Sequence, residues 1–182
     1  MTGQLYAMNS ASHILLDAAV SQEATADRCR VTTSRVLAIK QALVAASGDI
    51  ACGDPPPGKD AWAVDIAPIA KGQEARRLNL ANAAVSTSGD LEQFVVIGGV
   101  RYSHIVDPKT GLGVTGRRSV TVVALAGITA DSMTKAVMLL PPDRALRLVE
   151  ATPGAAAYVV IVGKDEKLET TASARFGSFL AK

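Results

Sequence analysis

The feature that most restricts the fold of this 182-residue chain is a glycine pair between two apolar, strand-like segments. Residues 94–97 (FVVI) and 100–105 (VRYSHI) flank Gly98 and Gly99. A tight two-residue turn between paired strands requires positive φ at both central positions, which glycine adopts without steric cost. The sequence therefore predicts an antiparallel β-hairpin here, and with it a fold that contains an antiparallel sheet.

Further strand-like segments lie on both sides of this hairpin. Trp62, Val64 and Ile66 alternate with Ala61, Ala63 and Asp65, which is the period-two pattern of a half-buried strand. More strands are predicted over residues 43–46, 78–85, 119–126 and 155–162, with residues 167–171 paired to the last of these. Residues 54–60 are predicted to be a loop, because three consecutive prolines exclude both helix and central strand.

Helical patterns lie near the two ends of the chain. Residues 17–40 are mainly helical in type. Residues 129–140 carry apolar side chains at helical spacing, and Thr129 is the predicted N-cap of that helix. A short further helix is predicted over residues 143–150. Because no polar linker divides the chain, we expect residues 1–182 to form one layered α+β domain, with a mixed, largely antiparallel sheet and packed helices.

Composition excludes several classes of protein. Apolar residues make up 48% of the chain and the formal net charge is +2, which argues against disorder and against nucleic acid as the main partner. The longest apolar run, residues 155–162, is much shorter than the roughly 20 residues that a membrane span needs. Cys29 and Cys52 do not make a disulfide framework, so we interpret them as semi-buried thiols in a reducing compartment.

Two segments in the middle of the chain are candidates for chemistry, and each also has a purely structural interpretation. Thr87, Ser88 and Gly89 end a predicted strand, where they form either a plain turn or an anion cradle of hydroxyls and a glycine N–H. His104 ends the hairpin beside a rigid Asp-Pro turn. It is either a structural hydrogen-bond bridge or a group for proton transfer or phosphate contact.

A carboxylate and a turn complete the set of candidates. Asp131 is placed in the first helical turn, where it either favours the helix dipole or contributes to a magnesium site. Lys135 follows at i+4 and is a competing cation for that carboxylate. The turn Ser47, Gly48 and Asp49 follows a predicted buried strand and is a weak signal by itself.

The order of these segments is more specific than any one of them. Residues 82–90 (NAAVSTSGD), a hairpin, residues 104–111 (HIVDPKTG) and residues 129–131 (TAD) follow one another along the chain. This order strongly resembles the FAD:protein FMN transferase (ApbE) family. The likeness extends from Leu16 to about Phe176 and covers only the later part of the family's usual length. It implies an ApbE-like, T-fold-type domain that is incomplete at the N-terminus.

The resemblance also implies an activity and a site. Members of this family cleave the pyrophosphate of FAD and attach FMN to a threonine of a target protein, typically a membrane redox subunit, with help from magnesium. Asp131 and the backbone carbonyl of Ala19 would bind the metal, and His104 would lie by the phosphates or manage the acceptor's proton. The flavin–phosphate pocket would be bordered by His104 and by Ser47, Gly48, Asp49, Thr87, Ser88 and Gly89.

Several residues depart from the family's pattern. Gln22 and Glu23 stand where the family has a lysine and a glycine, which removes a cation and adds an anion beside the pyrophosphate. Lys135 replaces a hydroxyl residue that would join Asp131 at the metal. Thr134 precedes this position by one residue, so its side chain would point about 100° around the helix from that of residue 135. These positions lead to the hypothesis that Asp131 pairs with Lys135 instead of magnesium.

Three interpretations therefore remain open. The first is an FAD:protein FMN transferase, and the second is a catalytically impaired relative that acts as a flavin-binding or interaction module. The third is an α/β domain whose resemblance to the family is only ancestral. A homo-oligomer is plausible if a second copy completes the site. The first basic residue is Arg28 and no lipid-modified cysteine lies near the start, so the chain as written is expected in the cytoplasm, although family members are usually exported lipoproteins.

Overall fold

A seven-stranded antiparallel sheet forms the main body of the described part of the chain. The computed structural model describes residues 12–15, 40–46, 48–89, 94–163 and 165–181. In sheet order the strands are β1 (Ser12–Leu15), β2 (Leu43–Ala46), β3 (Asp49–Cys52), β6 (Ala83–Gly89), β10 (Arg117–Ala124), β11 (Ala156–Val162) and β12 (Leu168–Ala172). Every neighbouring pair in this sheet is antiparallel.

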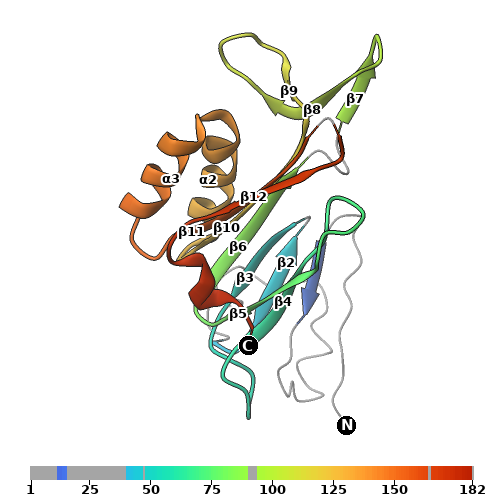
Figure 1. Ribbon diagram of the computed structural model, residues 1–182. Coiled ribbons are helices and arrows are strands. Elements are labelled where there is room, and N and C mark those ends of the chain that lie inside the picture. Colours follow the sequence, from blue (N-terminus) through green and yellow to red (C-terminus); the bar gives the residue numbers. More distant parts are fainter. Residues whose placement is uncertain (1–11, 16–39, 47, 90–93, 164, 182) are drawn as a thin grey trace, which may run out of the picture.

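Two helices, α2 (Gly127–Leu139) and α3 (Pro142–Ala151), cover one face of this sheet. Figure 1 shows them together on the same side of β6, β10 and β11. Because side chains alternate across a strand, Val122 of β10 faces the helices and packs in one apolar cluster with Met133 of α2. This arrangement confirms the expected mixed α+β class. Within the described residues no helix has the length and apolar character needed to cross a membrane.

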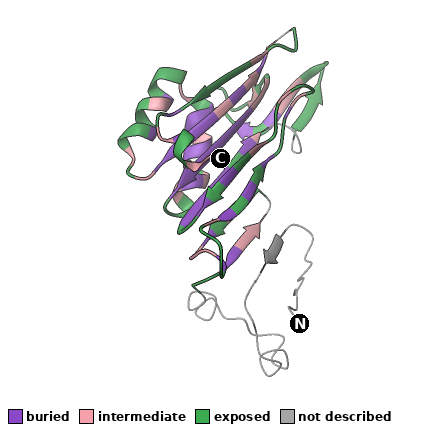
Figure 2. Cartoon of the chain, turned by 60° about the horizontal axis from the view of Figure 1, so that its bottom comes forward, coloured by how far each residue is buried: buried purple, intermediate pink, exposed green. Residues whose placement is uncertain are grey.

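The opposite face of the sheet is covered by a β-hairpin and a short 3-10 helix. The hairpin consists of β4 (Trp62–Ile66) and β5 (Arg76–Leu80), and the short helix is η2 (Phe176–Phe179). Leu78 of β5 is fully buried in a second apolar cluster that includes Val123 of β10. The main sheet is therefore the middle one of three layers, and Figure 2 shows its strands as the most continuous buried region.

A small sheet of β7 (Phe94–Ile97), β8 (Val100–Val106) and β9 (Gly113–Thr115) projects beyond the end of the main sheet (Figure 1). Gly98 and Gly99 have φ values of +57° and +78°. These values confirm the predicted hairpin, because its turn requires the left-handed region at both positions. All four residues of β7 are exposed, whereas β8 returns toward the body of the protein and buries part of its length.

One predicted strand was wrong in its bounds. Residues 78–85 form two strands rather than one, because β5 ends at Leu80 and β6 begins at Ala83. Asn82 between them has a φ of +49°, a left-handed conformation that asparagine tolerates better than most residues. The chain therefore leaves the hairpin layer at this turn and enters the main sheet, a change of layer that the apolar pattern alone does not reveal.

The start of the predicted second helix was also wrong. Helix α2 begins at Gly127, its N-cap is Ala126, and no side chain caps it. Thr129 is therefore not the N-cap, and Asp131 lies in the second helical turn rather than in the first. The helical segment predicted over residues 17–40 lies outside the described residues except for its last position.

Phe176 is expected to contribute strongly to the stability of the hairpin layer. It is 1% exposed, and its ring stacks on that of Tyr158, with the ring centroids 5.2 Å apart. We expect Phe176→Ala to lower the free energy of unfolding by roughly 3–5 kcal/mol, because the change removes buried apolar area and leaves a cavity. Urea denaturation measures this loss. The matched control is Phe94→Ala on exposed β7, for which a loss comparable to that of Phe176→Ala would contradict the proposed packing role.

Cys52 at the end of β3 is expected to react slowly with alkylating reagents. Burial raises the pKa of its thiol to about 11, so little thiolate is present in the folded protein near pH 8. In a Cys29→Ser background, we expect alkylation by iodoacetamide to be at least roughly tenfold slower in the native protein than in urea. The native rate should keep rising with pH beyond the ordinary pKa of a thiol. A native rate equal to the unfolded one would contradict this expectation.

Candidate functional site

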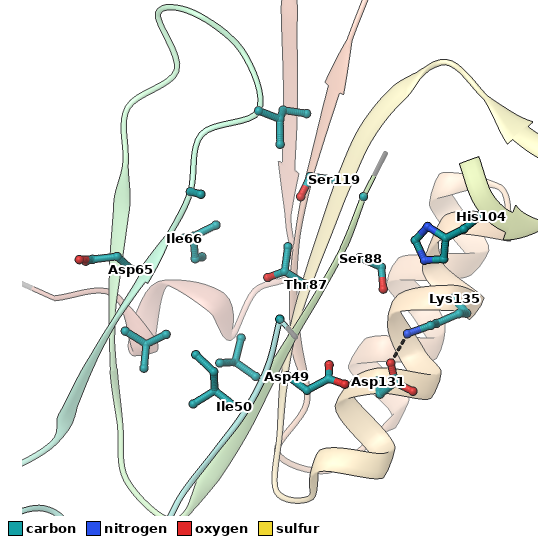
Figure 3. A pocket seen from close by; sticks show the side chains of 16 residues that line it. Asp49, Ile50, Asp65, Ile66, Thr87, Ser88, His104, Ser119, Asp131 and Lys135 are labelled. Carbon is teal, nitrogen blue, oxygen red and sulfur yellow. Dashed lines mark hydrogen bonds and ion pairs between the residues drawn. The ribbon is translucent and has the colours of Figure 1, made fainter. Parts of the chain in front are cut away.

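A cleft of about 440 Å³ lies where the main sheet, α2, the β4–β5 hairpin and β8 meet (Figure 3). Residues from all four candidate segments of the sequence, namely the 47–49 turn, residues 87–89, His104 and Asp131, line this cleft. Its lining includes Gly48, Asp49, Thr87, Ser88, Gly89, His104, Asp131 and Lys135. These residues come from four separate parts of the chain, so the fold brings together groups that are far apart in the sequence.

Two glycines give the backbone of this cleft its course. Gly48 has a φ of +102°, which favours glycine, and its carbonyl accepts a hydrogen bond from the Thr87 N–H at 3.2 Å. This bond joins the turn between β2 and β3 to the end of β6. At Gly89 a Cβ would lie 3.2 Å from the carbonyl oxygen of Arg118, closer than most side-chain contacts allow. The turn at Gly48 and the strand end at Gly89 therefore meet at one rim of the cleft.

The hydroxyl groups beside this rim are bonded to one another. Ser88 and Thr134 are buried, and their hydroxyl oxygens are 2.8 Å apart. The Thr134 hydroxyl also lies 2.7 Å from the Asp131 backbone carbonyl, which accepts a hydrogen bond from it. Thr134 thus faces the sheet and not the carboxylate of Asp131, in agreement with the expected rotation around the helix.

The carboxylate of Asp131 is paired with the ammonium of Lys135, one helical turn further on. Figure 3 shows the Lys135 side chain directed back toward Asp131 on the cleft side of α2. The two side chains are 38% and 37% exposed, so the pair is accessible to a molecule in the cleft. The pairing of these two residues was the hypothesis drawn from the sequence, and the structure shows it. Among the described residues, no three His, Cys, Asp or Glu side chains are grouped to hold a metal.

His104 lies on the same side of α2 as this ion pair. It belongs to β8, is exposed, and lines the cleft together with Asp131 and Lys135 (Figure 3). The expected convergence of His104 and Asp131 on one cleft is therefore observed. They reach it from a strand and a helix, because β8 extends to Val106 and α2 starts before Asp131.

An apolar wall of the cleft was missed by the sequence analysis. Val64 and Ile66 of β4, together with Ile69, are buried on the hairpin side of the cleft. Their alternation predicts a buried face but does not say what that face packs against. Asp65, between them in sequence, also lines the cleft and is paired with Arg77 at 2.6 Å, and the hydrogen bond from that guanidinium lowers the pKa of the Asp65 carboxyl.

Some predicted site residues cannot be placed. Ser47 lies outside the described residues, as do Ala19, Gln22 and Glu23. Their suggested roles toward the flavin, the metal and the pyrophosphate remain predictions. All other residues predicted for the site line the cleft.

Comparison with known proteins identifies relatives of this chain. Residues 9–159 match the sequence profile of the ApbE family. FAD:protein FMN transferase from Vibrio cholerae is 37% identical over 100 residues, which are 54% of this chain and 29% of that protein. The enzyme of the same name from Escherichia coli K12 is 35% identical over 97 residues, which are 53% of this chain and 27% of that protein.

A solved structure shows the same fold. The apo form of the flavinyl transferase ApbE from Pseudomonas stutzeri superimposes with a TM-score of 0.62 and 30% identity, covering 81% of this chain and 46% of that one. The chain thus spans less than half the length of these relatives. Because the family match covers most of its residues and the fold agrees, the protein belongs to the ApbE family.

Proposed function

We propose that this chain forms part of an FAD:protein FMN transferase site, which moves FMN from FAD to a threonine of a target protein. One observation carries the proposal: His104, Asp131 and the segments at residues 48–49 and 87–89 line a single cleft. The relatives named FAD:protein FMN transferase support the choice of reaction. A target protein of the membrane redox subunit type belongs to the same proposal.

The reaction exchanges a phosphoanhydride bond of FAD for a phosphoester bond to the target threonine. The threonine hydroxyl oxygen attacks the phosphorus on the FMN side of the FAD diphosphate, and the bond from that phosphorus to the bridging oxygen breaks. AMP leaves with the bonding electrons, and the hydroxyl proton passes to a base. Such transfers depend mainly on positioning and on neutralising the charge of the phosphates, so the protein's groups have little covalent work to do.

The lining residues suit these tasks. Gly48 and Gly89 line the cleft, and their lack of a side chain lets the Gly48 turn, the end of β6 and β10 pack closely around it. The apolar wall that includes Val64 and Ile66 offers a surface for a flat ring of the dinucleotide. His104 is the candidate base for the acceptor's proton, because its imidazole lines the cleft and has a ring nitrogen that can accept a proton.

The described residues do not fit a magnesium ion at Asp131. Magnesium requires near-octahedral oxygen ligands, and here the Asp131 carboxylate is paired with an ammonium. The neighbouring hydroxyls of Ser88 and Thr134 are bonded to each other. Ala19, the other ligand implied by the family resemblance, lies outside the described residues. We therefore derive no step of the reaction through magnesium.

The ion pair between Asp131 and Lys135 favours a second candidate function. If the ammonium holds the phosphates in the ground state only, the chain would bind the flavin dinucleotide without turning it over. Binding that is equally strong in the ground state and the transition state does not accelerate a reaction. The chain would then be a flavin-binding module of the same family.

An assay for FMN transfer separates the two functions. The protein is mixed with FAD and a peptide that bears an acceptor threonine, and mass spectrometry follows addition of one FMN to the peptide while chromatography follows AMP. We expect both products in equal amounts. We expect His104→Gln to slow transfer by roughly a hundredfold, because a positioned base contributes about that much.

The controls show what each result means. Glu169→Gln, at an exposed position of β12 that does not line the cleft, should leave the rate of transfer unchanged. FAD binding to His104→Gln should remain close to that of the parent chain if His104 acts on the proton. FAD binding by the parent chain without release of AMP would contradict the transferase and support the flavin-binding module.

A further inference from the structure

The charges that line the cleft are unusual for a site that holds a diphosphate. The described lining residues include the carboxylates of Asp49 and Asp131 and a single ammonium, that of Lys135. Asp65 belongs to the lining as well, but its carboxylate is directed away from the cleft (Figure 3). Asp65 is neutralised by Arg77 in an exposed ion pair. A diphosphate brings two further negative charges, so binding it here requires a cation close to Asp49 and Asp131.

Lys135 is placed to be that cation. Its ammonium has three N–H donors, and the ion pair with Asp131 uses one of them, which leaves donors for phosphate oxygens. The side chain is 37% exposed and lines the cleft, so these donors can meet a ligand without rearrangement of α2. The bond to Asp131 also holds the flexible lysine chain in place, and less conformational entropy is lost when a phosphate binds.

The oxygen atoms that a divalent ion would need are engaged in other bonds. The Ser88 and Thr134 hydroxyls bond to each other at 2.8 Å, and Thr134 is fully buried. A divalent ion on the Asp131 carboxylate would lie next to the Lys135 ammonium, and the two like charges would repel each other. Magnesium also gives up its water ligands reluctantly, so it does not easily displace the ammonium.

We propose that the Lys135 ammonium replaces the divalent cation, so that the cleft binds the diphosphate of a flavin dinucleotide without metal. This inference rests on the proposed function only for the identity of the ligand. It predicts that the diphosphate is held by a charge built into α2, and that the strength of binding is set by Lys135 and not by the concentration of magnesium.

Binding titrations of the full chain test the proposal. Quenching of flavin fluorescence gives the Kd for FAD and for riboflavin, which lacks phosphate. Each Kd is measured in EDTA and again in magnesium chloride at a concentration on the order of 5 mM. We expect the Kd for FAD to agree within about twofold in the two buffers. Lys135→Met keeps the length of the side chain and removes its charge, and it should weaken FAD binding in EDTA by roughly tenfold or more. Riboflavin binding should not change.

A control variant and further measurements sharpen the comparison. Lys59→Met makes the same substitution at an exposed position that does not line the cleft, and it should leave FAD binding unchanged. Circular dichroism checks that each variant is folded. Calorimetric titration with magnesium chloride alone should show no binding to the parent chain, and a magnesium-dependent gain of FAD affinity in Lys135→Thr would support the proposal.

The outcomes distinguish this inference from the proposed function. A tenfold tighter Kd for FAD in magnesium overturns the inference and leaves the transferase standing. The same holds if folded Lys135→Met binds FAD in EDTA as well as the parent chain does. Metal-independent FAD binding without FMN transfer supports the inference and contradicts the transferase. A parent chain that binds neither FAD nor riboflavin in either buffer overturns both.

Discussion

The pairing of β6 with β10 in the middle of the main sheet is the constraint on which the rest of the structure depends. Its register sets Thr87 opposite Thr121 and Ser88 opposite Val120. Because neighbouring residues of a strand point to opposite faces, Ser88 reaches α2 while Thr87 turns toward the hairpin layer. A shift by one residue would exchange the two faces and separate the Ser88 hydroxyl from Thr134. The end of β6 is thus the point at which both layers contribute to one cleft.

The ion pair on α2 gives this cleft its electrostatic character. Asp131 and Lys135 lie one turn apart, the spacing at which oppositely charged side chains meet on a helix. An exposed pair of this kind adds little to stability, with typical values of about 0.3–0.5 kcal/mol. Its main consequence is local, since it places a cation beside the carboxylate that the family resemblance implies as a metal ligand. The pair therefore matters for what the cleft binds more than for how firmly the helix is held.

Local signals in the sequence were sufficient to predict part of the fold and of the site. The turn at Gly98 and Gly99 was predictable because few residues other than glycine adopt positive φ at two successive positions. The grouping of His104 with Asp131 followed from the order of the family's motifs. Other features depend on tertiary contacts. The left-handed conformation at Asn82 directs the chain from one layer to another. The apolar pattern of residues 78–85 gives no sign of this turn and predicts a single strand. The apolar cleft wall depends on where the β4–β5 hairpin packs, and period-two alternation carries no such information.

The two candidate functions are linked through the charge of one group. A divalent ion would stabilise the negative charge that develops on the phosphates during transfer, because its charge of +2 would act on several of their oxygens. A lysine ammonium carries half that charge and is tethered to its own helix, so it can hold a diphosphate while stabilising the transition state less. If the proposed function holds, a cleft with Asp131 engaged by Lys135 would retain ground-state binding of the diphosphate more readily than catalysis. Such a cleft would bind a flavin dinucleotide even where the rate of transfer is low, so binding and turnover must be measured separately to tell the two functions apart.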